Sequence, residues 1–216
     1  MSALRTIGRF VRLEVQLYVA LGRWLARRVD VPVGATGWGY SRMVTPVMWL
    51  WIFGSACELP IAHVLVPWEG VRIALLVVGV WGLVWMIGLL ASLKVYPHLV
   101  AGAGLTVRYG KLARIAVPWT AVAEARYDDR DIEGVVRTLR TRESEAGTEL
   151  YVPVNNRVNV VLVLAEPLPV PTPRGVVPAV LLGIWLDDPR EFVAAARAAI
   201  ASAGSVGGAG SVGGSV

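Results

Sequence analysis

The residue with the clearest potential for chemistry is Glu58, an acid inside a long apolar run at residues 46–66. An acidic side chain at the centre of a membrane helix costs about 2.5–3.5 kcal/mol on insertion scales, and such acids are often functional. Together with His63, Glu58 suggests a proton relay or an ion site. However, five helical residues place the two side chains about 140° apart, unless Pro60 kinks the helix.

The alternative role for Glu58 is structural. Pro60 has no N–H, so the carbonyl of Ala56 loses its helical partner. A protonated Glu58 could donate to that carbonyl or to a neighbouring helix. Two helices alone cannot enclose a pathway, so a relay would require an oligomer or a partner. We therefore favour the structural role.

An acidic run at residues 128–133 holds three aspartates and Glu133. It lacks calcium-loop spacing, and Arg130 competes for the carboxylates, so a solvated loop is expected. His98 has no cysteine, serine or second histidine at catalytic spacing. The sequence contains no nucleophile elbow, Walker motif or metal-ligand cluster. We therefore expect no catalysis, no metal and no cofactor.

The elements that position these residues begin with two apolar runs, at residues 46–66 and 71–93. About 20 helical residues cross the roughly 30 Å hydrocarbon core of a bilayer. A four-residue connector predicts a tight transmembrane helical hairpin over residues 44–98. Glycines in the second run would allow close helix approach. Trp81 and Trp85 lie four residues apart and are expected to pack against the first span.

Charge is distributed unevenly along the chain. Residues 1–43 hold seven arginines against two acids, whereas residues 44–98 and 99–216 are each neutral. The basic residues are Arg5, Arg9, Arg12, Arg23, Arg27, Arg28 and Arg42. The positive-inside rule places this flank in the cytoplasm, and two spans return the chain to the same side. We expect a multi-pass protein of the cell membrane with both termini cytoplasmic and no nucleic-acid partner.

Residues 1–30 predict a basic amphipathic helix. Its apolar residues recur at three- and four-residue spacing, with arginines on other faces. Such a helix suits the membrane interface, where its arginines would meet anionic lipid headgroups of the inner leaflet. Alternatively, the helix packs on the C-terminal domain, and both interpretations can hold. Residues 31–43 contain proline and glycines and are predicted to form a linker.

Residues 99–202 predict a β domain. About seven short strands are expected, at residues 105–109, 112–117, 121–127, 135–141, 150–154, 158–164 and 180–186. Gly110-Lys111 and Asn155-Asn156 are hairpin signals. A C-terminal helix follows, with Asp188 as its N-cap and proline at its first position. The predicted fold class is α+β, with a PH-like barrel capped by this helix and a mobile coil at residues 203–216.

The stretch from Gly104 through Val122 resembles the opening strands of bacterial PH-like domains that follow paired transmembrane helices. The whole chain except its tail resembles a set of actinobacterial two-span membrane proteins. That likeness is carried by residues 44–51, Asn159-Val160, Glu166-Pro167-Leu168 and Asp187-Asp188-Pro189. It implies a fold and a membrane location but no activity. Eukaryotic PH domains bind phosphoinositides through a longer basic first hairpin loop, so headgroup specificity is not implied here.

The sequence as a whole favours a membrane-anchored, non-catalytic binding or assembly module that presents a PH-like domain at the cytoplasmic face. Its expected partners are the lipid bilayer and either another protein or further copies of itself in a homo-oligomer. The alternative is a small accessory subunit of a transporter or envelope complex, in which Glu58 and His63 contribute inside the membrane.

Overall fold

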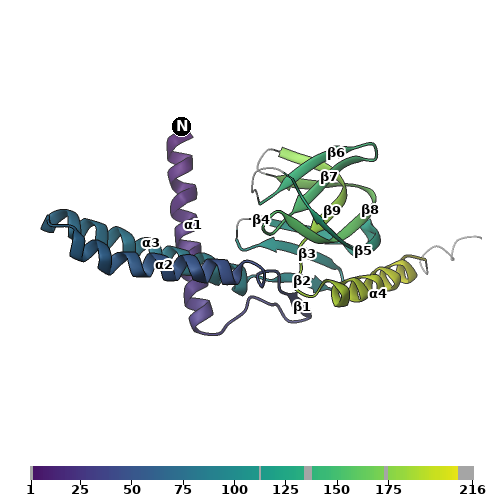
Figure 1. Ribbon diagram of the computed structural model, residues 1–216. Coiled ribbons are helices and arrows are strands. Elements are labelled where there is room, and N and C mark those ends of the chain that lie inside the picture. The colour runs from purple at the N-terminus through teal and green to yellow at the C-terminus, as the bar shows by residue number, and fades with distance from the viewer. Residues whose placement is uncertain (1, 112, 134–137, 173–174, 209–216) are drawn as a thin grey trace, which may run out of the picture. The chain divides into compact units, whose positions relative to one another are not determined.

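The computed structural model describes residues 2–111, 113–133, 138–172 and 175–208. The chain divides into two compact units, which are described separately. Unit 1 comprises Met1–Asp30 and Arg42–Tyr96, and unit 2 comprises Val31–Ser41 and Pro97–Val216. The fold is mixed α+β, with helices α1, α2 and α3 in unit 1 and the strands with helix α4 in unit 2 (Figure 1).

Helices α2 (Thr45–Leu65) and α3 (Glu69–Val95) form the predicted hairpin and lie side by side in Figure 1. Pro46 lies in the first turn of α2, where its missing N–H has no helical partner to lose. The helix then continues through Pro60 as one element. Gly79 brings the helices together, because a Cβ at that position would collide with the Leu59 side chain.

Helix α1 (Ser2–Leu25) packs against α3. At Gly88 of α3 the backbones almost touch, since a Cβ there would lie 3.2 Å from the Leu17 carbonyl oxygen. Ala20 is fully buried in a small cluster with Val95 and Tyr96. Every buried residue of α3 lies in its C-terminal third, between Gly88 and Val95. The buried part of the contact with α1 is therefore confined to one end of the hairpin.

Helix α1 ends in a Schellman turn. Arg27 has a positive φ of 54°, and its N–H donates to the Trp24 carbonyl at 2.9 Å. The N–H of Arg28 donates to the Arg23 carbonyl at 2.8 Å. These bonds satisfy the last helical carbonyls, although a non-glycine residue holds the left-handed position. The helix thus ends at Leu25, five residues before the predicted boundary at residue 30.

Unit 2 contains two sheets, with strand orders β1-β2-β3-β4 and β5-β8-β9-β7-β6. The first comprises β1 (Ala35–Trp38), β2 (His98–Ala101), β3 (Gly104–Tyr109) and β4 (Ala113–Pro118). The second comprises β5 (Val122–Asp131), β6 (Arg140–Ser144), β7 (Gly147–Val152), β8 (Arg157–Thr172) and β9 (Gly175–Ile184). Neighbouring strands are antiparallel except β7 and β9, which run parallel.

One hydrophobic core joins both sheets to helix α4 (Pro189–Gly208). Leu105 and Val117 come from the first sheet, Leu162 and Ile184 from the second, and Phe192 from α4. Among the described residues, no strand of one sheet pairs with a strand of the other. The sheets therefore do not close into the expected barrel. They are linked through a single 3₁₀ turn, Trp119–Ala121, between β4 and β5.

The predicted linker at residues 31–43 contains strand β1. Thr36 and Trp38 pair with Val100 and His98 of β2. Tyr40 follows and is only 1% exposed, so its ring belongs to the core of unit 2. The four-residue strand lacks a strong β pattern and depends on its partner, which lies some sixty residues further along. The β domain predicted at residues 99–202 therefore also includes residues 31–41 and His98.

Both predicted turns form, but only the one at Gly110 joins two paired strands, because β9 lies between β7 and β8 in the second sheet. Asn155 and Asn156 have φ values of 49° and 60°, as a two-residue turn with positive φ requires. Val154 and Arg157 close this turn as an isolated antiparallel bridge. At the other turn, Gly110 has a φ of 53° between β3 and β4. Asparagine and glycine tolerate these left-handed conformations at lower cost than other residues.

The longest hairpin, β8 with β9, has no counterpart in the predicted strands beyond Leu164. Pro167, Pro169 and Pro171 alternate along β8, and Pro169 pairs with Pro178 of β9. Neither proline can donate, so this must be a non-hydrogen-bonded pair of the ladder. Every second residue of a strand directs its N–H to the same side. For the three prolines of β8 that side faces away from β9, where β8 has no partner beyond Leu164. The prolines are therefore tolerated, and they block further strand addition.

Two further differences concern the ends of elements. The acidic run predicted as a loop is the end of strand β5, which extends to Asp131. Helix α4 continues to Gly208, so residues 203–208 of the predicted mobile tail are helical. Residues 209–216 of that tail and residues 135–137 of the strand predicted at 135–141 lie outside the described part of the chain.

Candidate functional site

The surface of the α2–α3 hairpin is the most unusual feature of the chain. Both helices are long and apolar enough to cross a membrane. In the most apolar 18-residue stretch of each helix, only 6% is buried for α2 and 11% for α3. Phe53 is 67% exposed, Val64 82% and Val77 61%. A core helix of a water-soluble domain would have its apolar side chains covered by protein, and these are not.

Glu58 and His63 are both exposed on α2. Within the described part of the chain, Glu58 forms no hydrogen bond or ion pair, and therefore makes neither of the two structural bonds expected from the sequence. His63 also forms no hydrogen bond or ion pair there, so the two side chains are not bonded to each other. Cys57 is a free cysteine and is likewise exposed. Cys57, Glu58 and His63 are thus exposed, whereas Leu59 packs on Gly79 of α3 and the Ser55 hydroxyl lies 3.9 Å from the sulfur of Met86 on α3.

A hydrogen-bonded triad connects α1 to the middle of α3. The indole Nε1 of Trp81 donates to Glu14 at 2.8 Å and to the hydroxyl oxygen of Tyr18 at 2.9 Å. The Tyr18 hydroxyl donates to Glu14 at 2.7 Å. The bonds from Tyr18 and Trp81 lower the pKa of Glu14, so its carboxylate is the stabilised form. The sequence predicted that Trp81 packs on the first span, and the structure shows that its polar atom faces α1.

The predicted basic flank divides into two groups. Arg23 pairs with Asp30 at 2.5 Å and lies over the ring of Tyr96, 6.0 Å from its centroid. Arg12, Arg27 and Arg28 are exposed and form no ion pair within the described residues. Arg42 is also exposed and has further contacts. The side chains of Arg5 and Arg9 lie outside the described part of the chain.

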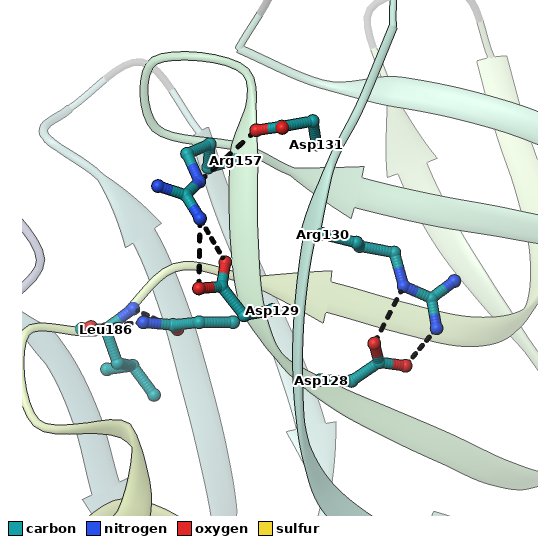
Figure 2. A network of polar contacts seen from close by, with 7 residues as sticks. Asp128, Asp129, Arg130, Asp131, Arg157 and Leu186 are labelled. Carbon is teal, nitrogen blue, oxygen red and sulfur yellow. Dashed lines mark hydrogen bonds and ion pairs between the residues drawn. The ribbon is translucent and has the colours of Figure 1, made fainter.

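The acidic run of β5 forms ion pairs on two sides of the strand, as Figure 2 shows. Asp128 binds Arg130 through both carboxylate oxygens, including Nε to Oδ1 at 3.1 Å. Asp129 accepts two bonds from Nη2 of Arg157, at 2.9 and 3.0 Å. Asp131 lies 3.2 Å from Nε of Arg157. Asp128 also lies 3.8 Å from Nε of Arg126. The carboxylates are therefore divided among three arginines and do not converge on one point.

A β-bulge explains this division. Between Tyr127 and Arg130 the pairing of β5 with β8 shifts, so that Asp128 and Asp129 together lie opposite Asn159. The bond from Arg130 lowers the pKa of Asp128. Asn159 is buried, and its amide exchanges two hydrogen bonds with the Leu186 backbone, at 2.7 and 2.9 Å. The described residues contain no group of three or more His, Cys, Asp or Glu side chains placed to hold a metal ion.

His98, the last residue of the hairpin predicted at residues 44–98, lies instead in the core of unit 2. It is 1% exposed and stacks on Tyr40, with ring centroids 4.5 Å apart. Its Nδ1 accepts the Arg108 backbone N–H at 3.0 Å, so a neutral ring carries its proton on Nε2, which is 3.3 Å from the Trp185 carbonyl. Burial lowers the pKa of His98 to about 4. The ring is a neutral structural group that joins three segments.

The sequence did not predict the polar bonds of Trp81 within unit 1 or of Tyr40 within unit 2. Their partners lie more than 55 residues away along the chain, and no local pattern signals them. The Tyr40 hydroxyl accepts the Gly110 N–H at 2.6 Å, which fixes the β3–β4 turn. Comparisons of this chain with protein-family models, with curated proteins and with solved structures found no match.

Proposed function

We propose that this chain is a membrane-anchored, non-catalytic binding or assembly module. The observation that carries the proposal is the α2–α3 hairpin, whose apolar side chains are exposed on two helices long enough to cross a bilayer. Lipid acyl chains would cover this surface as protein covers a core. A helical hairpin also suits a bilayer, because helices pair most of their backbone N–H and C=O groups internally.

The orientation of the module follows from charge. The arginine-rich flank precedes α2, so the positive-inside rule puts it, and unit 2, on the cytoplasmic side of the cell membrane. Unit 2 has its own core and a C-terminal helix that packs on both sheets, which supports its use as a PH-like binding domain. Its neutral net charge favours a protein partner or a second copy of the chain over nucleic acid.

The experiment that tests this function is purification of the intact protein from membranes in a mild detergent at native abundance. The proposal expects a stable complex, either with an identified protein partner or as a homo-oligomer. A monomer that carries no partner under these conditions would contradict the assembly function.

A second candidate is an accessory subunit of a transporter or envelope complex. The observation in its favour is that Glu58 and His63 are exposed on α2 without a bonded partner in the described residues. An acid in this position would be available to another chain within the membrane.

Glu58→Gln separates the two candidates, because the amide keeps the shape of the protonated acid as well as a donor and an acceptor. For the assembly module we expect this variant to be inserted, expressed and assembled like the wild type. The measurement is a comparison of membrane abundance and complex recovery with those of the wild type and of the matched His63→Gln variant. Loss of cellular function by Glu58→Gln at normal abundance would favour the transporter subunit.

A further inference from the structure

We infer that α1 lies along the cytoplasmic interface of the bilayer, with one flank in the acyl chains and the opposite flank among anionic lipid headgroups. This inference rests on the proposed membrane hairpin. It adds a third membrane element and fixes both its depth and its rotation. The argument uses the three faces of α1 and the points where it meets α3.

The depth follows from helix lengths. Helix α3 has 27 residues and α2 has 21. Helix α2 ends, and α3 begins, at the same short turn. The extra six residues of α3 therefore extend beyond α2 at the Val95 end, by about 9 Å. Counted from Glu69, about 20 residues cross the hydrocarbon core and end near Gly88. Gly88 is the residue at which the backbone of α1 touches α3, through Leu17.

The rotation follows from the angular positions of the α1 residues, at about 100° each. Leu17 marks the face against α3. On one flank lie Val11 and Val15, which are 55% and 54% exposed. On the other flank lie Arg12 and Gln16. Helix α1 thus has an uncovered apolar flank and a basic flank on either side of its contact with α3.

The contacts with α3 show which flank faces the membrane interior. Glu14 and Tyr18, on the side of the apolar flank, bond to Trp81 in the middle of α3. On the basic side, Arg23 lies over Tyr96, just beyond the end of α3. The apolar flank therefore faces the hydrocarbon and the basic flank faces the water side. An interfacial helix needs this arrangement.

The headgroups that suit the basic flank are anionic. Arg12 on this flank, and Arg27 and Arg28 in the turn that ends α1, are exposed and have no ion-pair partner within the described residues. Arginine binds phosphate through two parallel hydrogen bonds, and a negatively charged leaflet attracts such clusters. The occupant is thus a lipid surface rich in anionic phospholipid.

The test uses the full-length protein with Cys57→Ser, reconstituted in vesicles of phosphatidylcholine and phosphatidylglycerol. Nitroxide labels at Val11→Cys and Gln16→Cys report collision with oxygen, which concentrates in hydrocarbon, and with a water-soluble nickel complex. A label at Phe53→Cys on α2 is the reference for a lipid-exposed span. We expect an oxygen preference at Val11 and Phe53 that is several-fold higher than at Gln16.

The outcomes separate the two proposals. If Phe53 lacks an oxygen preference, the membrane hairpin itself is wrong. If Phe53 shows the preference and Val11 does not, α1 is not interfacial; a Val11 label shielded from both reagents would mean that protein covers this flank.

A triple variant, Arg12→Gln with Arg27→Gln and Arg28→Gln, tests the headgroups. We expect it to lose most of the oxygen preference at Val11, whereas Arg190→Gln on α4 should have no effect. An unchanged Val11 signal in the triple variant would overturn the role of anionic lipid.

Discussion

Replacing Phe192 with alanine is expected to lower the free energy of unfolding of unit 2 by about 3–5 kcal/mol, because the deletion leaves a cavity where both sheets meet α4. Phe192 is fully buried, and its ring makes an edge-to-face contact with Trp38, with centroids 5.4 Å apart. Denaturant unfolding of the full-length protein in detergent, followed by β-sheet circular dichroism, measures the effect.

Trp185→Ala is the matched control. Trp185 is half-buried, with the guanidinium of Arg157 5.7 Å from the centroid of its ring. Its replacement should therefore destabilise unit 2 less than that of Phe192. A loss below about 1 kcal/mol for Phe192→Ala would mean that α4 does not complete the core.

The second large effect is acid destabilisation of unit 2 through His98. In the folded state the pKa of His98 is lowered from 6.5 to about 4, mainly because burial disfavours the imidazolium, with the Trp185 carbonyl opposing the shift. Between these two values the unfolded chain binds a proton that the folded chain does not. Stability therefore falls as the pH decreases from about 6.5 to about 4, by at most about 3 kcal/mol.

The measurement is the free energy of unfolding of unit 2 at several values of pH across this window, for the wild type and for His98→Gln. The glutamine variant should lose stability at neutral pH but should lack this part of the pH dependence. The ion-paired Asp128 has a lowered pKa and acts only at lower pH, so it does not obscure the window. Identical pH profiles for the two proteins would contradict the assignment of a neutral buried His98.

Local signals in the sequence predicted the helices and the tight turns well. The two apolar runs gave α2 and α3, and Asn155-Asn156 gave the turn before β8, because each signal lies within the element that it specifies. Strand β1 was missed because it is stabilised by pairing with β2, far along the chain. The proline-rich end of β8 was missed because proline argues against a strand unless the free edge is known.

The candidate sites, too, depend on contacts that the local sequence does not specify. The type and spacing of Glu58 and His63 indicated polar groups in an apolar run, but could not show that both side chains face outward. The acidic run looked like a loop because sequence spacing does not show the bulge that divides Asp128 and Asp129 between different arginines. The closed barrel was inferred from the number of strands, and strand number does not determine whether the sheets join at their edges.

The central claim is that α2 and α3 cross the cell membrane with unit 2 on the cytoplasmic side. Single cysteines in the Cys57→Ser background test it directly, one at Trp68 in the turn between the two spans and one at Ala201 on the exposed face of α4. We expect an impermeant thiol reagent to label the Trp68→Cys protein in intact cells and the Ala201→Cys protein only after lysis. Labelling of Ala201→Cys but not Trp68→Cys in intact cells would reverse the orientation, and equal labelling of both would contradict the membrane hairpin.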